Sequence, residues 1–405
     1  MATKSSIMDT NSYSDDYVSL LSATTKDMIS RREKWMGGAY RLFYRKPVNL
    51  VRGKGQYLWD AEGNKYLDMY NNVAGIGHCH PAVVEAVTEQ MKLLNTHTRY
   101  LHERIIDYSE DLLAMMPEEI DKIMFMCTGS EANDLALRVA QEYTGGTGII
   151  VSREAYHGTS ALTSGCSPAL GSEQPLLPNV RLIDTPDYYR QGGTPEEFTA
   201  WYSGEMQKKI NELAAAGYKF SCFLADSIFS SDGVHPNPVG FLKAAIDVVH
   251  KNGGVFIADE VQPGFARTGD AFWGFARHGI IPDMVTTGKP MGNGIPISGL
   301  AAKHEVLEAA KQHPAWETGK DNEYVEMTYQ TLVGLGQDVR KIYWQFGTDG
   351  SVICGKYNIP TIGYSGAMMS QAHQAQEHVE INRVLDCIEG YTAVLCKLYD
   401  LVMPE

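Results

Sequence analysis

The fold is decided by one stretch of the sequence, Gly254-Val-Phe-Ile-Ala-Asp259-Glu-Val-Gln262. It joins a short apolar run to two consecutive carboxylates. Such a run is typical of a strand buried on both faces of a parallel sheet. Similar runs recur between segments with helical apolar spacing. We expect buried strands at residues 122–127, 148–152, 220–225, 254–258 and 283–287, and helices at residues 80–91, 103–115, 131–143, 205–215 and 241–251. This alternation predicts an α/β fold with a mostly parallel sheet.

Less regular sequence flanks this central part. Residues 17–32 have the pattern of a polar helix in an N-terminal arm, and residues 48–53 and 56–63 that of two short strands bounded by turns. Residues 380–400 predict a helix whose apolar stripe consists of Ile381, Val384, Leu385, Ile388 and Val394.

Composition excludes several classes of partner. The net charge of −14 argues against nucleic acid, because binding to a polyanion depends on Lys and Arg that neutralise phosphates. No stretch approaches the roughly 18 apolar residues of a membrane span, and residues 1–16 lack the apolar core of a secretion signal. The seven cysteines are odd in number and scattered, which is typical of reduced thiols. We predict a cytoplasmic protein that binds neither membrane nor nucleic acid.

Ligands of parallel sheets lie beyond the carboxyl ends of the strands, so the residues that follow each strand are the candidates. After residues 122–127 comes Thr128-Gly129-Ser130, at the start of a helix. Gly129 allows close approach of the backbone, and a helix start with a hydroxyl group suits a phosphate. The alternative is an ordinary serine N-cap.

Two further strand ends carry an acid and an amine. Asp259 is a candidate partner that keeps a pyridinium nitrogen protonated, so that the ring can accept electrons. The alternative is a helix cap or an ion pair. Lys289 lies between glycines and has room to reach an aldehyde, and a desolvated lysine can act as a nucleophile. The alternative is a solvated loop lysine.

Together these features resemble a known family over roughly residues 30–319: the class III (omega) aminotransferases, which have pyridoxal 5'-phosphate (PLP) fold type I. The matching motifs are Tyr57-Leu-Trp-Asp-Ala-Glu-Gly63, Gly75-Ile-Gly-His-Cys-His-Pro81, Cys127-Thr-Gly-Ser-Glu-Ala-Asn-Asp134, Ala155-Tyr-His-Gly158, the stretch from Ile257 to Gly269, and Thr287-Gly-Lys-Pro-Met-Gly-Asn-Gly294. Residues 94–102 and 288–294 are most similar to the alanine–glyoxylate aminotransferase 2-like group, which includes ethanolamine-phosphate phospho-lyases.

The resemblance implies the catalytic roles. Lys289 forms a Schiff base with PLP and then moves protons at the substrate carbon. Asp259 pairs with the pyridine nitrogen, and Gln262 lies near the 3'-hydroxyl group of the ring. Gly129 and Ser130 hold the phosphate.

Further residues are implied beside the ring. Tyr156 stacks on it, with His157 next to Tyr156. Asp226 stands where many relatives have a glutamate that helps to position the groups receiving the substrate, and aspartate is one methylene shorter. Ile295 also departs from close relatives, which have histidine there.

The resemblance ends after Gly319, where the family continues into a small domain with a substrate-binding arginine. Residues 320–405 instead resemble the end of an M20-family metallopeptidase catalytic domain, in which the His373 position is a zinc ligand, with Asp349 nearby. His373 and Glu377 are spaced as a His-x-x-x-Glu pair, but a binuclear zinc site needs further ligands that we do not find upstream. We therefore predict no metal site and an atypical small α/β segment.

These features predict a division into an arm with short strands (1–60), a PLP-binding large domain (61–319) and the M20-like segment (320–405). The resemblance implies an aminotransferase that moves an amino group between an amine or omega-amino acid and a keto acid. It also implies a homodimer. Alternatives are a PLP-dependent phospho-lyase acting on an amino-alcohol phosphate, a PLP-binding protein with little turnover because the small domain is missing, and an M20-type zinc hydrolase.

Overall fold

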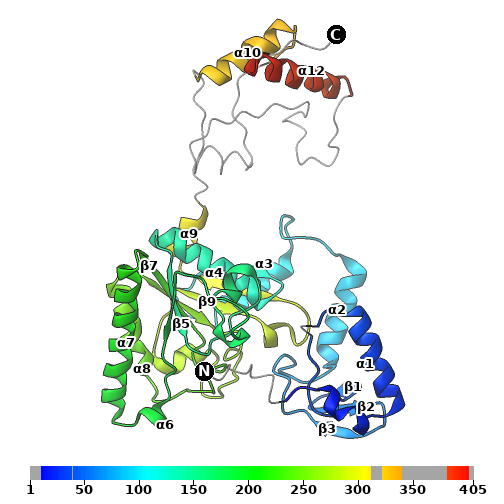
Figure 1. Ribbon diagram of the computed structural model, residues 1–405, viewed down its shortest axis with the longest axis vertical. Coiled ribbons are helices and arrows are strands. Elements are labelled where there is room, and N and C mark those ends of the chain that lie inside the picture. Colours follow the sequence, from blue (N-terminus) through cyan, green and yellow to red (C-terminus); the bar gives the residue numbers. More distant parts are fainter. Residues whose placement is uncertain (1–10, 39, 312–321, 340–380, 401–405) are drawn as a thin grey trace. The chain divides into compact units, whose positions relative to one another are not determined.

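A computed structural model (Figure 1) describes residues 11–38, 40–311, 322–339 and 381–400. The chain divides into two compact units, Met1–Ala310 and Lys311–Glu405, and each is described by itself.

The first unit is built on a seven-stranded sheet in the order β4-β10-β9-β8-β7-β5-β6. The strands are β4 (Lys122–Met126), β5 (Gly148–Ser152), β6 (Val180–Ile183), β7 (Phe220–Ala225), β8 (Val255–Asp259), β9 (Met284–Thr287) and β10 (Ser298–Ala302). The neighbours from β9 to β6 pair in parallel, whereas β10 is antiparallel to both β4 and β9. The predicted α/β fold with a mostly parallel sheet is confirmed.

Two strands of this sheet were not predicted, and a third was predicted to be more buried than it is. β10 consists of Ser, Gly, Leu and Ala, which have little intrinsic strand preference, yet it lies buried between two partners. β6 is short and carries Arg181. We expected β4 to be buried, but it is the edge of the sheet and is partly exposed.

Side chains alternate between two hydrophobic clusters, one on each face of the sheet, as the two-residue period of a strand requires. Phe223 and Phe256 pack on the face covered by α7 (Pro195–Ala215) and α8 (Phe241–Lys251). Leu224 and Ile257 pack on the opposite face, against α4 (Gly129–Thr144). The central strands are therefore covered on both sides, as their apolar sequence predicts.

The predicted helices of this unit are present, but the arm helix begins at Ala23 rather than at residue 17, and three shorter helices were not predicted. Besides α4, α7 and α8, this unit contains α1 (Ala23–Trp35), α2 (Pro81–Leu93), α3 (Glu103–Leu113), α5 (Ala161–Ser164), α6 (Tyr188–Gln191) and α9 (His304–Lys311). Short 3-10 turns lie at Asp15–Leu20 (η2), Pro168–Leu170 (η3), Gly274–His278 (η4) and Lys289–Gly292 (η5). α7 begins at Pro195 rather than at residue 205. Thr194 and Glu197 form a capping box, and proline follows at the first helical position, so the sequence did contain the signal for this start.

The N-terminal part forms a separate three-stranded antiparallel sheet of β1 (Leu50–Lys54), β2 (Tyr57–Asp60) and β3 (Lys65–Leu67). The first two strands were predicted and the third was not. Asp60 closes the turn between β2 and β3, because its carboxylate accepts hydrogen bonds from the Asn64 backbone N–H (2.8 Å) and the Tyr66 hydroxyl (2.6 Å).

The described part of the second unit consists of α10 (Glu323–Gly334) and α12 (Ile381–Leu398). The predicted C-terminal helix is confirmed, but its predicted stripe is wrong: Val384, Leu385 and Ile388 are exposed, whereas Ala393 and Cys396 are buried. Asp349, His373 and Glu377 lie outside the described residues. Among the described helices, none has the length and apolar character needed to cross a bilayer.

An aromatic cluster between α7 and α8 should carry much of the stability of the first unit. Phe241 is 1 % exposed, and its ring meets those of Phe198, Tyr202 and Phe229 at centroid distances of 5.2–6.0 Å. We expect Phe241→Ala to lower the free energy of unfolding by about 3–5 kcal/mol, because it leaves a cavity in a close-packed core. Urea unfolding followed by circular dichroism measures this. Tyr189→Ala, at a side chain that is 94 % exposed, is the control and should change it by less than about 0.5 kcal/mol.

Candidate active site

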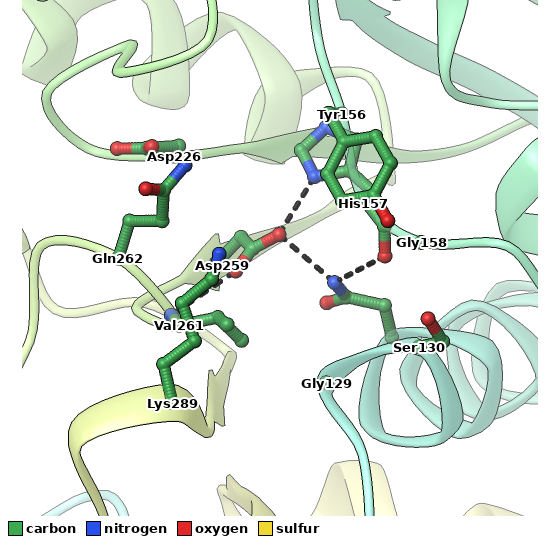
Figure 2. A pocket seen from close by; sticks show the side chains of 11 residues that line it. Gly129, Ser130, Tyr156, His157, Gly158, Asp226, Asp259, Val261, Gln262 and Lys289 are labelled. Atoms are coloured by element: carbon green, nitrogen blue, oxygen red, sulfur yellow. Dashed lines mark hydrogen bonds and ion pairs between the residues drawn. The ribbon is translucent and has the colours of Figure 1, made fainter. Parts of the chain in front are cut away.

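A cavity of about 150 Å³ lies at the carboxyl ends of the central strands, and Figure 2 shows its lining. All eight residues predicted for the site lie in it together: Gly129, Ser130, Tyr156, His157, Asp226, Asp259, Gln262 and Lys289. Asn133, Gly158 and Val261 complete the lining and were not predicted. The residues come from the segments that follow β4, β5, β7, β8 and β9, so neighbouring strand ends build a single site.

The start of α4 leaves Ser130 available to a ligand. Thr128 is the N-cap: its hydroxyl oxygen accepts from the Glu131 backbone N–H at 3.1 Å, and Glu131 accepts from the Thr128 N–H at 2.8 Å. The ordinary N-cap is therefore Thr128 and not Ser130. The Ser130 Oγ accepts from the Thr159 N–H at 3.1 Å. Its own hydroxyl hydrogen has no acceptor among the described residues, which leaves a donor beside the free N–H groups of the helix start.

Glycines give this end of the cavity its shape. Gly158 has a φ of +138°, and a Cβ there would lie 2.5 Å from the Ser130 Oγ. A Cβ on Gly129 would lie 3.0 Å from a methyl group of Val261. Larger residues would push into Ser130 or Val261 and fill the space where backbone amides meet a ligand.

Asp259 is the most constrained acid of the cavity. Its Oδ2 accepts from the His157 Nδ1 (2.7 Å) and the Asn133 Nδ2 (2.8 Å), and its Oδ1 accepts from the Val261 N–H (3.1 Å). An ionised carboxylate has about four acceptor positions, so one remains for a donor in the cavity. The side chain is buried, and Figure 2 shows its contact with His157 as a dashed line.

Asn133 was missed by the sequence analysis although it lies in a quoted motif. It donates to Asp259 and to the His157 carbonyl oxygen (2.9 Å), and its Oδ1 accepts from the Thr286 hydroxyl at 2.6 Å. These contacts fix which side of its amide faces Asp259. His157, predicted next to Tyr156, is buried and hydrogen-bonds to Asp259, and its Nε2 has no partner in the described structure.

Lys289 follows β9 in an unusual backbone conformation, with a φ of +43° that few residues other than glycine adopt. Its side chain points toward the Asp259 carboxylate (Figure 2). Burial lowers the pKa of the Lys289 ammonium below its usual value, and Arg267 acts in the same direction, while the charges of Asp259 and Asp226 oppose it. A larger fraction of Lys289 is therefore neutral and nucleophilic near pH 7.

Asp226 lies at the end of the cavity away from Ser130 (Figure 2). Burial raises its pKa to about 6, and the charge of Asp259 adds to this, whereas hydrogen bonds from Ser230 and Ile228 oppose it. Its Oδ1 accepts from the Ile228 N–H (2.9 Å), and its Oδ2 from the Ser230 N–H (3.1 Å) and the Ser230 hydroxyl. The carboxyl is thus directed into its own turn.

Tyr156 and Gln262 complete the walls. The Tyr156 ring is 39 % exposed and forms the open side of the cavity, while burial raises the pKa of its hydroxyl. The Gln262 Oε1 accepts from the Asn72 Nδ2 at 2.7 Å. The described residues contain no cluster of three or more His, Cys, Asp or Glu that could hold a metal ion. The cavity therefore brings together an amine, a buried acid and the start of a helix that suits an anion.

Comparison with known proteins shows which family the chain belongs to. The family model for aminotransferase class III matches residues 43–318. This chain is a class III aminotransferase family member.

Several relatives support the family at the level of sequence. The chain is 38 % identical over 294 residues to an alanine–glyoxylate aminotransferase 2-like protein of Drosophila melanogaster, covering 70 % of this chain and 59 % of that one. It is 34 % identical over 310 residues to ethanolamine-phosphate phospho-lyase homolog 1 of Caenorhabditis elegans, covering 71 % and 66 %. The chain thus spans about three fifths of the length of the curated relatives it matches.

Solved structures of similar proteins support the same family. A phospholyase from Arthrobacter in complex with phosphoethanolamine is 39 % identical, with a TM-score of 0.68 over 71 % of this chain and 68 % of that one. A PLP-bound amine transaminase from an uncultivated Pseudomonas species is 26 % identical, with a TM-score of 0.60 over 68 % and 65 %. The resemblance to class III aminotransferases of the alanine–glyoxylate aminotransferase 2-like group is confirmed.

The altered pKa of Lys289 can be tested without any cofactor. Labelling of its amine, followed by peptide mass spectrometry, should reach half its maximal rate at a lower pH than a lysine in an unstructured peptide, because only the neutral amine reacts. Asp259→Asn should move that midpoint further down, since the carboxylate favours the charged ammonium. An upward movement in Asp259→Asn would contradict the assigned electrostatics.

Proposed function

We propose that this chain is a PLP-dependent aminotransferase that moves an amino group between an amine or omega-amino acid and a keto acid. The observation that carries the proposal is the arrangement of Lys289, Asp259 and the start of α4 around one cavity. Bound PLP supplies an aldehyde that joins amines and a ring that takes up the electrons released when a substrate bond breaks.

The residues present fit this cofactor. The remaining acceptor position of Asp259 suits a protonated ring nitrogen, and Asn133 and His157 keep the carboxylate in place. At the other end, Ser130 and the N–H groups of α4 suit a phosphate, because Gly158 leaves room in front of the Ser130 hydroxyl. All of these residues line one cavity, which suits a single anionic ring compound.

The roles of the residues follow from their positions. Lys289 would hold the cofactor through its amine and would accept and return a proton at the substrate carbon. Asp259 would accept a hydrogen bond from the ring nitrogen and help to keep a proton there, and three donors hold its carboxylate in place. Tyr156 lines the cavity and would lie against the bound ring, where it would exclude water.

A phospho-lyase reaction on an amino-alcohol phosphate is the second candidate. It is favoured by the similarity to the Arthrobacter phospholyase and to the phospho-lyase homolog of Caenorhabditis elegans. It needs the same lysine but ends in release of inorganic phosphate. A PLP-binding protein with little turnover is the third, because the family match ends at residue 318 and the chain spans only part of its relatives.

The division at residues 60/61 and 319/320, a homodimer and a cytoplasmic location are parts of the same proposal. The cysteine pattern supports the cytoplasm, although two similar proteins are named mitochondrial. Analytical ultracentrifugation and cell fractionation test the last two: a monomer, or protein confined to an organelle, would contradict them.

Lys289→Ala tests the main proposal. We expect wild-type protein incubated with PLP to gain a visible absorption band and to form keto product from an amine with pyruvate. Lys289→Ala should lose the band and reduce turnover by about 10⁴-fold or more, as for removal of a covalent nucleophile. Lys92→Ala, at an exposed surface lysine, is the control and should retain both.

Three outcomes separate the candidates. Keto product supports the aminotransferase, whereas phosphate released from phosphoethanolamine without keto product from any amine supports the lyase. A band that no amine changes supports the protein with little turnover, and absence of a band in wild-type protein contradicts all three.

Gly158→Ala tests the phosphate end of the cavity. The added Cβ would lie 2.5 Å from the Ser130 Oγ at a backbone φ that suits glycine. We expect PLP affinity to fall at least tenfold, equivalent to about 1.4 kcal/mol, in a titration by absorbance. The matched control is Gly204→Ala on α7, where a Cβ meets no atom within 4 Å. Equal PLP affinity in the two variants would argue against this position for the phosphate.

A further inference from the structure

A segment from outside the large sheet reaches the cavity. Residues 68–78 connect β3 to α2, and Asn72 in this segment donates from its Nδ2 to the Gln262 Oε1 at 2.7 Å. On its other side, the Asn72 carbonyl oxygen accepts from the Arg267 Nη2 at 2.9 Å. Asn72 is therefore attached at two points to the loop that follows Asp259.

This segment has a fixed shape of its own. The Asp68 carboxylate accepts from the Tyr70 N–H (3.0 Å), the Asn71 N–H (3.0 Å) and the Asn71 Nδ2 (2.9 Å), and it pairs with the His78 ring at 2.6 Å. Burial opposes its charge, but these hydrogen bonds hold the pKa of Asp68 well below its usual range. The segment thus presents Asn72 in one position rather than in many.

The direction of the hydrogen bond from Asn72 sets which side of the Gln262 amide faces the cavity. An amide carries one acceptor oxygen and one donor NH₂ group, which point in different directions. The oxygen of Gln262 is occupied by Asn72. Its Nε2 has no partner among the described residues, and Gln262 lines the cavity, so the donor side is the one available to a ligand.

We propose that Asn72 is a positioning residue that turns the NH₂ group of Gln262 toward the ring hydroxyl of the cofactor, and that it thereby stabilises the anionic form of this oxygen. The inference rests on the proposed function, because it needs PLP in the cavity. A donor favours a charged oxygen, whereas an amide oxygen in the same place would repel it. Asn72 acts only through Gln262.

Asn72→Asp separates orientation from simple loss of a contact. A carboxylate only accepts hydrogen bonds, so Gln262 must donate its NH₂ group to it and turn its oxygen toward the cavity. Asn72→Leu removes the partner without imposing an orientation. Relative to wild type, we therefore expect the largest effect from Asn72→Asp and a smaller effect from Asn72→Leu.

The measurement is a pH titration of the visible absorption band in full-length protein loaded with PLP. The midpoint of the titration is the pH at which a proton next to the ring oxygen is lost. After this loss, the negative charge of the oxygen is no longer shared with that proton. A donor stabilises this form most and keeps the midpoint low. We expect Asn72→Asp to raise the midpoint by about one pH unit, a tenfold change in proton affinity, with Asn72→Leu between it and wild type.

Two controls exclude a direct effect of the new charge. Val73→Asp places the same charge on the next residue, which is partly exposed, and should shift the midpoint much less. In a Gln262→Leu background, Asn72→Asp should cause no further shift, because the amide through which it acts is gone. Circular dichroism checks that each variant is folded, and either Asn72 variant alone suffices to test the direction.

The outcomes are distinct. Unchanged midpoints in both Asn72 variants, or an equal shift by Asn72→Asp with and without Gln262, would overturn the inference while leaving the proposed function intact. Absence of the band in wild-type protein would instead remove the proposed function and this inference with it. A shift that depends on Gln262 supports both.

Discussion

The site depends on one buried carboxylate at the end of a central strand. Asp259 is 4 % exposed, and burial of an unsatisfied carboxylate costs several kcal/mol. Its donors come from three places: Asn133 on α4, His157 after β5, and the Val261 backbone. All three donors reach the Asp259 carboxylate only when α4 and both strand ends are correctly placed. The arrangement that satisfies Asp259 also brings the start of α4 and Lys289 to the same cavity.

The neighbouring acid shows how one strand end serves two purposes. Glu260 is fully buried, and burial raises its pKa to about 7. It accepts from the Ser227 hydroxyl (2.6 Å) and from the N–H groups of Gly274 (2.7 Å) and Phe275 (2.9 Å). Successive side chains of a strand point in opposite directions. Asp259 thus faces the cavity, while Glu260 holds the Gly274–His278 turn beneath it.

The sequence alone predicted the residues of the site more completely than the residues that form hydrogen bonds with them. Asp259, Lys289 and Ser130 could be predicted because each follows an apolar strand, and parallel strands place such residues along one edge. Asn133 and Asn72 could not, because they act through hydrogen bonds to residues 126 and 190 positions away. Asn133 lies in a family motif and Asn72 does not, but neither position reveals its partner, so only the folded chain shows such pairs. Strand β10 was missed for a related reason, since its burial rather than its composition makes it a strand.

The long-range contacts also explain how Lys289 keeps its unfavourable backbone conformation. A left-handed φ at a residue with a side chain costs about 1–3 kcal/mol and persists only where surrounding structure enforces it. Asn293, close to Lys289 in the chain, makes two hydrogen bonds to the segment between β3 and α2. Its Oδ1 accepts from the Ile76 N–H (3.1 Å), and its Nδ2 donates to the Gly77 carbonyl oxygen (3.0 Å). Gly75 allows this approach, because a Cβ there would lie 3.2 Å from Pro290. The segment that orients Gln262 therefore also braces the lysine turn. The small N-terminal sheet, by carrying this segment, is as much a part of the site as the strands whose ends line it.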